Sequence, residues 1–119
     1  MKIPGPDHPI TVTPAGKHIV VRLGDVVVAD TRNALALQEA TYPVAYYVPR
    51  ADADMRHFAR TDHHTTCPYK GEASYFSLTA DGQQADNAVW TYETPYPAMA
   101  DIREFLAFYP NKVQIDVTD

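Results

Sequence analysis

The sequence predicts a single mainly β domain, built as a folded sheet or a barrel-like sheet. Short runs of β-branched and aromatic residues, separated by turn pairs such as Gly24-Asp25 and Asp81-Gly82, are typical of short strands. Eight tyrosines and ten prolines also favour strands and fixed turns over long helices. A length of 119 residues suits one domain with one modest core.

The first part of the chain is predicted to be an extended arm followed by a hairpin. Residues 1–16 contain four prolines and two glycines, so we expect an arm that lies over the core of a domain spanning residues 17–119. Residues 18–23 read as a strand. Residues 26–30 form its return after the Gly24-Asp25 turn.

The next two segments are predicted as strands, and one short helix follows them. Residues 33–39 contain good helix formers, but Leu35 and Leu37 alternate with alanines, which favours a half-buried strand. Residues 44–48 form a strand that Pro49 ends. The helix runs over residues 52–60, with Asp52 as its N-cap and with Met55 and Phe58 facing inward.

The second half begins with a polar stretch, residues 61–71, which we predict to be a long loop. Loops of this length in a compact domain are often functional. Strands follow at residues 73–78 and 88–92, and residues 101–106 read as a helical turn or the start of a strand. Residues 105–109 and 112–117 are expected to form a closing hairpin.

Charge and composition restrict the classes of function. A formal net charge of −5 argues against nucleic-acid binding. A single cysteine excludes an internal disulfide and paired-thiolate zinc sites, and it suits a reducing compartment. The apolar runs are too short for a signal peptide or a membrane span, so we expect a cytoplasmic protein without membrane contact.

Several segments together resemble a known family. They are Asp30-Thr31-Arg32, residues 35–39, Tyr42-Pro43, residues 46–49, residues 67–75, and Trp90-Thr91-Tyr92. In this order, from about His18 to Val113, they resemble the domain-of-unknown-function family numbered 427, and the Cys-Pro-x-Lys-Gly segment is the most specific part of the resemblance.

The resemblance implies a small β-tent-like domain, similar to the group that includes methionine sulfoxide reductase B. Many β-tent proteins hold zinc with four cysteines; this chain has one, so neither that metal nor any other cofactor is expected. The family has also been labelled a nucleotidyltransferase. The sequence contains no glycine-rich phosphate loop and no paired-carboxylate motif of clear metal-binding spacing that would support this label.

Three residues are candidates for catalysis. Cys67 is the candidate nucleophile, because a nearby cation such as Lys70 would favour its thiolate. Lys70 is followed by Gly71, which lets a ligand approach the backbone. Glu39 is a candidate proton carrier. The structural alternative is a small buried cysteine beside a solvated lysine and an ordinary ion pair.

The remaining candidates would bind a ligand. Arg32 is predicted to clamp an anion, and His64 to supply a base or a polar contact. His63 and His64 are adjacent in an extended segment, so they point to opposite sides and a metal site is not expected. Four aromatic residues on separate strands are expected to line one cavity, although such residues more often form core: Tyr47, Tyr75, Trp90 and Tyr92.

These observations lead to one main hypothesis and two alternatives. The main hypothesis is a pocket for an unknown polar or anionic small molecule, with or without cysteine and lysine chemistry. The alternatives are a non-catalytic module for protein interaction and the nucleotidyltransferase-like activity of the family label. Exposed strand edges would also suit a homodimer.

Overall fold

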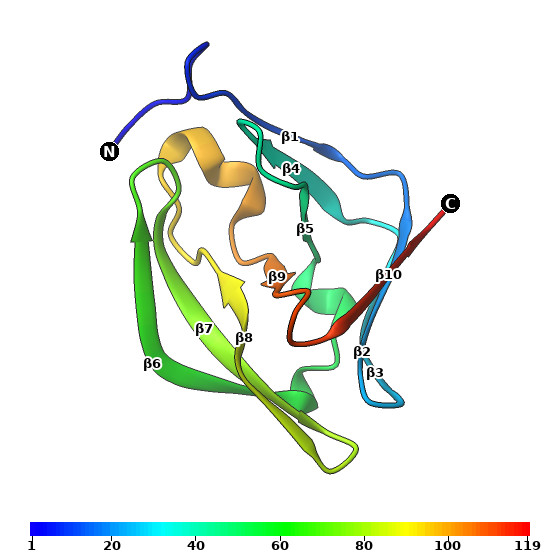
Figure 1. Ribbon diagram of the computed structural model, residues 1–119. Coiled ribbons are helices and arrows are strands. Elements are labelled where there is room, and N and C mark those ends of the chain that lie inside the picture. The colour runs from blue at the N-terminus through cyan, green and yellow to red at the C-terminus, as the bar shows by residue number, and fades with distance from the viewer.

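The computed structural model describes residues 1–119 and confirms the mainly β prediction, with ten strands and three short 3₁₀ helices (Figure 1). None of these helices is long and apolar enough to cross a membrane. The strands are β1 (Ile10–Pro14), β2 (His18–Leu23), β3 (Val26–Thr31), β4 (Leu35–Glu39), β5 (Ala45–Tyr47), β6 (Phe58–Cys67), β7 (Gly71–Ala80), β8 (Gln83–Thr91), β9 (Leu106–Phe108) and β10 (Gln114–Thr118). The helices are η1 (Arg50–Asp52), η2 (Met55–His57) and η3 (Pro97–Ile102).

The strands form three antiparallel sheets and not a closed barrel. Their orders are β10-β2-β3, β1-β4-β5 and β6-β7-β8-β9. The second and third sheets meet where Val48 and Leu106 exchange two backbone hydrogen bonds of 2.7 and 2.8 Å. Figure 1 shows β6 and β7 on one side of the molecule and β1 and β4 on the other, so the two sheets fold toward each other about this bridge.

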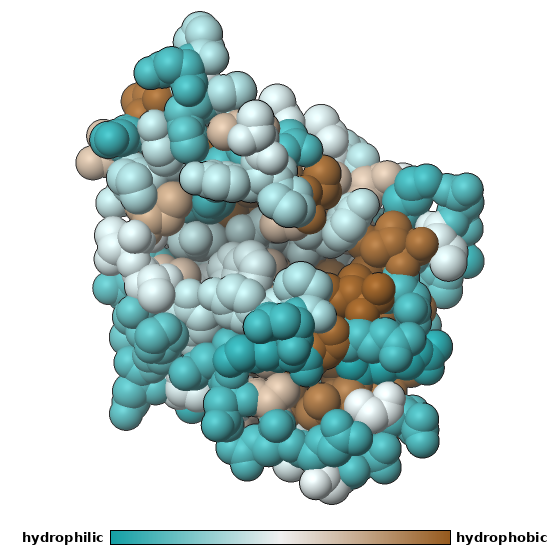
Figure 2. All heavy atoms as spheres, viewed as in Figure 1, coloured by the Kyte–Doolittle hydropathy of each residue, from teal (hydrophilic) through white to brown (hydrophobic).

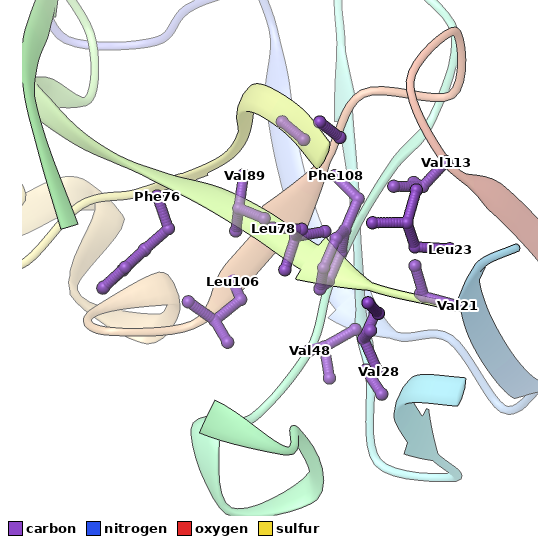
Figure 3. Packing of buried hydrophobic residues seen from close by; sticks show 14 of the residues in the cluster. Val21, Leu23, Val28, Val48, Phe76, Leu78, Val89, Leu106, Phe108 and Val113 are labelled. Atoms are coloured by element: carbon purple, nitrogen blue, oxygen red, sulfur yellow. The ribbon is translucent and has the colours of Figure 1, made fainter. Parts of the chain in front are cut away.

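The larger hydrophobic core packs side chains of the β10-β2-β3 sheet against the four-stranded sheet (Figure 3). Alternate residues of β2, namely Ile19, Val21 and Leu23, point inward as the sequence pattern predicts. Leu78 and Val89 meet them from the four-stranded sheet and are fully buried. A smaller core that includes Leu37, Met99 and Ile102 supports the aromatic residues described below.

The predicted helix over residues 52–60 is wrong. Two separate 3₁₀ turns, η1 and η2, occupy residues 50–57, and β6 begins at Phe58. Asp52 accepts a hydrogen bond from Thr31 Oγ1 at 2.7 Å and caps nothing, whereas Asp54 accepts the backbone N–H of Arg56. Met55 and Phe58 do pack against the larger core, as expected.

The predicted polar loop over residues 61–71 is also wrong, because most of it belongs to β6. This strand pairs with β7 from Phe58 to Cys67 with one irregularity between Arg60 and His64, and most of its side chains are exposed. The real turn consists only of Pro68, Tyr69 and Lys70.

The predicted closing hairpin of residues 105–109 and 112–117 does not form. Strands lie near both predicted places, but β9 pairs with β8 and β10 pairs with β2. The turn around Pro110 therefore passes the chain from one sheet to another. In the N-terminal arm, residues 10–14 form β1, which pairs with β4. The strand predicted over residues 33–39 is confirmed, with β4 beginning at Leu35.

Candidate functional site

The turn between β6 and β7 directs Lys70 into the protein. Gly71 begins β7 with a φ of 111°, a conformation that residues with a side chain rarely adopt. The carbonyl of Lys70 accepts the backbone N–H of Tyr96 at 3.0 Å, which holds the turn against the segment before η3. Lys70 is therefore only 8% exposed, which is unusual for a lysine.

Lys70 contacts the two other predicted catalytic residues. Its ammonium donates to Oε1 of Glu39, the last residue of β4, and to Sγ of Cys67, which lies 3.6 Å away. The structure thus brings together Cys67, Lys70 and Glu39 from two different sheets. An ammonium beside a sulfur atom stabilises negative charge on it.

His8 is also part of this cluster, although no pattern in the sequence predicts it. Its ring stacks on Tyr69 with 4.2 Å between centroids and an interplanar angle of 7°. Its Nε2 donates to the other carboxylate oxygen of Glu39, Oε2, at 2.8 Å. Both oxygens of Glu39 therefore accept hydrogen bonds from the protein.

Glu39 is held in its ionised form. Burial alone would raise the pKa of this carboxyl, but the hydrogen bonds from Lys70 and His8 outweigh it and lower the pKa below the usual 4.5. A carboxylate with a low pKa and two occupied oxygens is poorly suited to collect a proton. We therefore assign Glu39 the role of anchoring Lys70.

A cavity of about 440 Å³ lies beside this cluster, between the two folded sheets. Glu39, Lys70, Leu37 and Thr65 form part of its wall. The rest of the wall is largely aromatic, made by Tyr42, Tyr47, Tyr75, Trp90, Tyr92 and Tyr109. Of the nine predicted site residues, six line this cavity.

Hydrogen bonds hold several of the aromatic side chains of the cavity wall in place. The Tyr75 hydroxyl bonds to Thr65 Oγ1 at 2.9 Å and to the Tyr109 hydroxyl at 3.2 Å. Trp90 donates its indole N–H to the Tyr47 hydroxyl at 3.1 Å. Burial raises the pKa of both Tyr47 and Tyr109, so these hydroxyls keep their protons at neutral pH.

Tyr92 differs from the other buried tyrosines, because its hydroxyl bonds to no other group of the protein. The residue is only 6% exposed and lines the cavity. No fully buried side-chain oxygen or nitrogen is left without a hydrogen bond, so the Tyr92 hydroxyl must open onto the cavity. Burial, with the nearby Tyr47 and Cys67, raises its pKa, which keeps it a neutral donor.

Three predicted residues lie outside the cavity wall. Arg32 is exposed and forms no hydrogen bond or ion pair, and the exposed His64 lies 3.7 Å from Glu72. Cys67 is half-buried behind Lys70. No three His, Cys, Asp or Glu side chains are grouped as a metal site would require.

The fold and the site describe a mainly β domain that encloses a tyrosine-walled cavity beside a buried Lys–Glu pair. The chain belongs to the family described as Domain of unknown function (DUF427), which it matches over residues 11–119. This match confirms the resemblance seen in the sequence and contains the whole site except His8. No curated protein matches the sequence.

Proposed function

We propose that the cavity binds a small molecule that carries a planar ring and a hydrogen-bond acceptor, such as a carbonyl or a carboxylate. The observation that carries this proposal is the Tyr92 hydroxyl, which belongs to a largely buried residue, opens onto the cavity and has no acceptor in the protein. No protein group competes for this proton, so an acceptor on a ligand can take it with a direct hydrogen bond.

Other donors support an acceptor-rich ligand. An ammonium group has three N–H bonds, and Lys70 uses two of them on Glu39 and Cys67. The Tyr47 hydroxyl accepts from Trp90 and still has its own proton to donate. Because Glu39 neutralises Lys70, both a neutral carbonyl compound and a monoanion suit the cavity.

The aromatic walls support a planar ligand. The rings of Tyr75 and Tyr109 are nearly parallel, at 8° with centroids 6.4 Å apart, and the Trp90 ring lies 4.6 Å from Tyr109. Flat faces of this kind favour stacked or edge-on contact with another ring. The cavity volume falls within the range of about 300–1,000 Å³ that is usual for ligand pockets.

The test is to titrate the protein with benzamide, benzoate and toluene while following the fluorescence of Trp90. We expect the first two to bind and toluene, which has no acceptor, to bind more weakly. Tyr92→Phe should weaken benzamide binding by about 5-fold, the loss of one hydrogen bond. Tyr96→Phe, outside the cavity, is the matched control. Equal binding of toluene and benzamide, or an unaffected Tyr92→Phe variant, would contradict the proposal.

Cysteine-based catalysis at this site is a second candidate, which the 3.6 Å contact between Lys70 Nζ and Cys67 Sγ favours. Cys67 would be the nucleophile and Lys70 would stabilise negative charge on its sulfur. A Cys67→Ala variant that still binds benzamide would separate binding from this chemistry.

A further inference from the structure

A second, apolar groove lies next to the cavity. Its volume is about 340 Å³, and seven of the nine residues that line it are hydrophobic. They come from β5, from the segment before it, from β8 and from the C-terminal part of the chain, and include Val44, Tyr46, Phe108, Ile115 and Val117. Figure 2 shows hydrophobic side chains gathered over β10 on this face.

The groove and the cavity share part of their walls. Pro43, Ala45 and Trp90 line both. Trp90 contacts Tyr47 and Tyr109 of the cavity wall, and it lines the groove together with Phe108. Trp90 therefore lies, with Pro43 and Ala45, in the wall between two adjoining spaces.

The sheet topology explains why side chains, and not a strand, separate the cavity from the groove. Strands β5 and β9 are joined only by the bridge between Val48 and Leu106. Toward Ala45 no further backbone hydrogen bonds close the space between the two sheets. Side chains rearrange far more easily than a strand leaves a sheet, so this shared wall is the most adaptable boundary between the two spaces.

We propose that the cavity and the groove form one two-chamber site for an amphipathic small molecule. Its polar head lies in the cavity near Tyr92 and Lys70, and its apolar tail passes Trp90 into the groove. The proposal rests on the proposed function of the cavity. Val44 and Val117, which are 40% and 39% exposed, are the groove residues that a tail would remove from water.

The experiment uses benzoate and its 4-ethyl, 4-butyl and 4-hexyl derivatives as probes. The chain has one tryptophan, so its fluorescence reports on the shared wall directly. Each methylene that enters the groove should strengthen binding by about 4-fold, until the groove is filled. An affinity that does not change along the series would overturn the two-chamber site.

Three matched variants test where the tail lies. Val44→Asp and Val117→Asp should remove the gain with tail length and leave benzoate affinity unchanged. Val27→Asp is the control, because Val27 is 37% exposed and lines neither space. The same loss in Val27→Asp, or no loss in the groove variants, would overturn the proposal. If benzoate binds but a longer tail does not increase the affinity, only the second chamber is refuted. If none of the probes binds, the proposed function of the cavity is refuted as well.

Discussion

Trp90 and Tyr47 connect the two sheets that enclose the cavity. The indole N–H donates to the tyrosine hydroxyl at 3.1 Å, and the rings meet edge-on at 88° with centroids 6.2 Å apart. Because Trp90 lies on β8 and Tyr47 on β5, this side-chain contact adds to the backbone bridge between Val48 and Leu106. Both residues line the cavity.

Tyr47→Phe should reduce the free energy of unfolding by about 1–2 kcal/mol, because the Trp90 N–H loses its acceptor while the packing of the ring is retained. Urea denaturation measures this change. Tyr46→Phe is the matched control; its hydroxyl forms no hydrogen bond, and we expect almost no change. Equal effects of the two substitutions would show that the Trp90–Tyr47 hydrogen bond does not stabilise the fold.

Glu39→Gln should destabilise the protein at neutral pH by about 3 kcal/mol, because Lys70 then remains buried without its carboxylate. Thermal or urea unfolding measures the loss. Glu72→Gln is the control, since Glu72 is an exposed glutamate whose one ion pair is with the exposed His64. A loss no larger than that of Glu72→Gln would remove the structural role assigned to Glu39.

The stability of the wild-type protein should also depend on the ionisation of Glu39. Its pKa in the folded protein lies below the usual 4.5, so the ion pair contributes fully above pH 4.5 and its contribution is lost as the pH falls through the folded value. The free energy of unfolding, measured between pH 7 and pH 3, should therefore fall less steeply for Glu39→Gln than for the wild type. The same pH dependence of the free energy of unfolding in both proteins would contradict this contribution of Glu39.

Lys70→Met should slow the alkylation of Cys67 in the native protein several-fold at neutral pH. The thiolate is the reacting form, and the variant removes the ammonium 3.6 Å from its sulfur. Iodoacetamide modification followed by mass spectrometry measures the rate. Unfolded samples of both proteins should react equally fast, and Lys112→Met should match the wild type. A native thiol that reacts only on unfolding would exclude a nucleophilic Cys67.

Gly71→Ala should cost more stability than Gly16→Ala. Gly16 has a φ of 64°, which alanine reaches at a cost of about 1 kcal/mol, whereas Gly71 has a φ of 111°, where a side chain costs about 2–3 kcal/mol. Because Gly71 follows Lys70, its substitution should also weaken benzamide binding. Equal destabilisation by the two substitutions would show that the turn adapts to a side chain.

The alternation of hydrophobic and polar residues predicted most of the strands that have one buried face. It does not predict strands that are stabilised mainly by backbone pairing. In β2 every second residue is buried, so the pattern is visible in the sequence. In β6 seven of the ten residues are exposed and none is fully buried, and the strand exists because its backbone pairs with β7. The pairings of β9 and β10 join segments far apart in the chain, and neither leaves a local signal.

The sequence also predicted a part of the candidate site. The segment from Cys67 to Gly71 identified Lys70 and Cys67, and the aromatic strand residues identified much of the cavity wall. The charge of Arg32 predicts a contact with a bound anion, but the Arg32 side chain is exposed and Thr31 beside it is the buried residue. His8 had no signal, because its contact with Glu39 joins residues that are 31 positions apart and depends on how the arm lies.

The arm has a practical consequence for anyone who produces this protein. The backbone N–H of Lys2 donates to the carbonyl of Pro68 at 2.7 Å, and the Lys2 ammonium lies 5.9 Å from the centre of the Tyr69 ring. A purification tag fused ahead of Met1 would therefore start beside the turn that positions Lys70. At the other end, Asp119 is held only by an exposed ion pair with Lys17, which contributes little to stability. A tag attached after Asp119 should leave the cavity undisturbed.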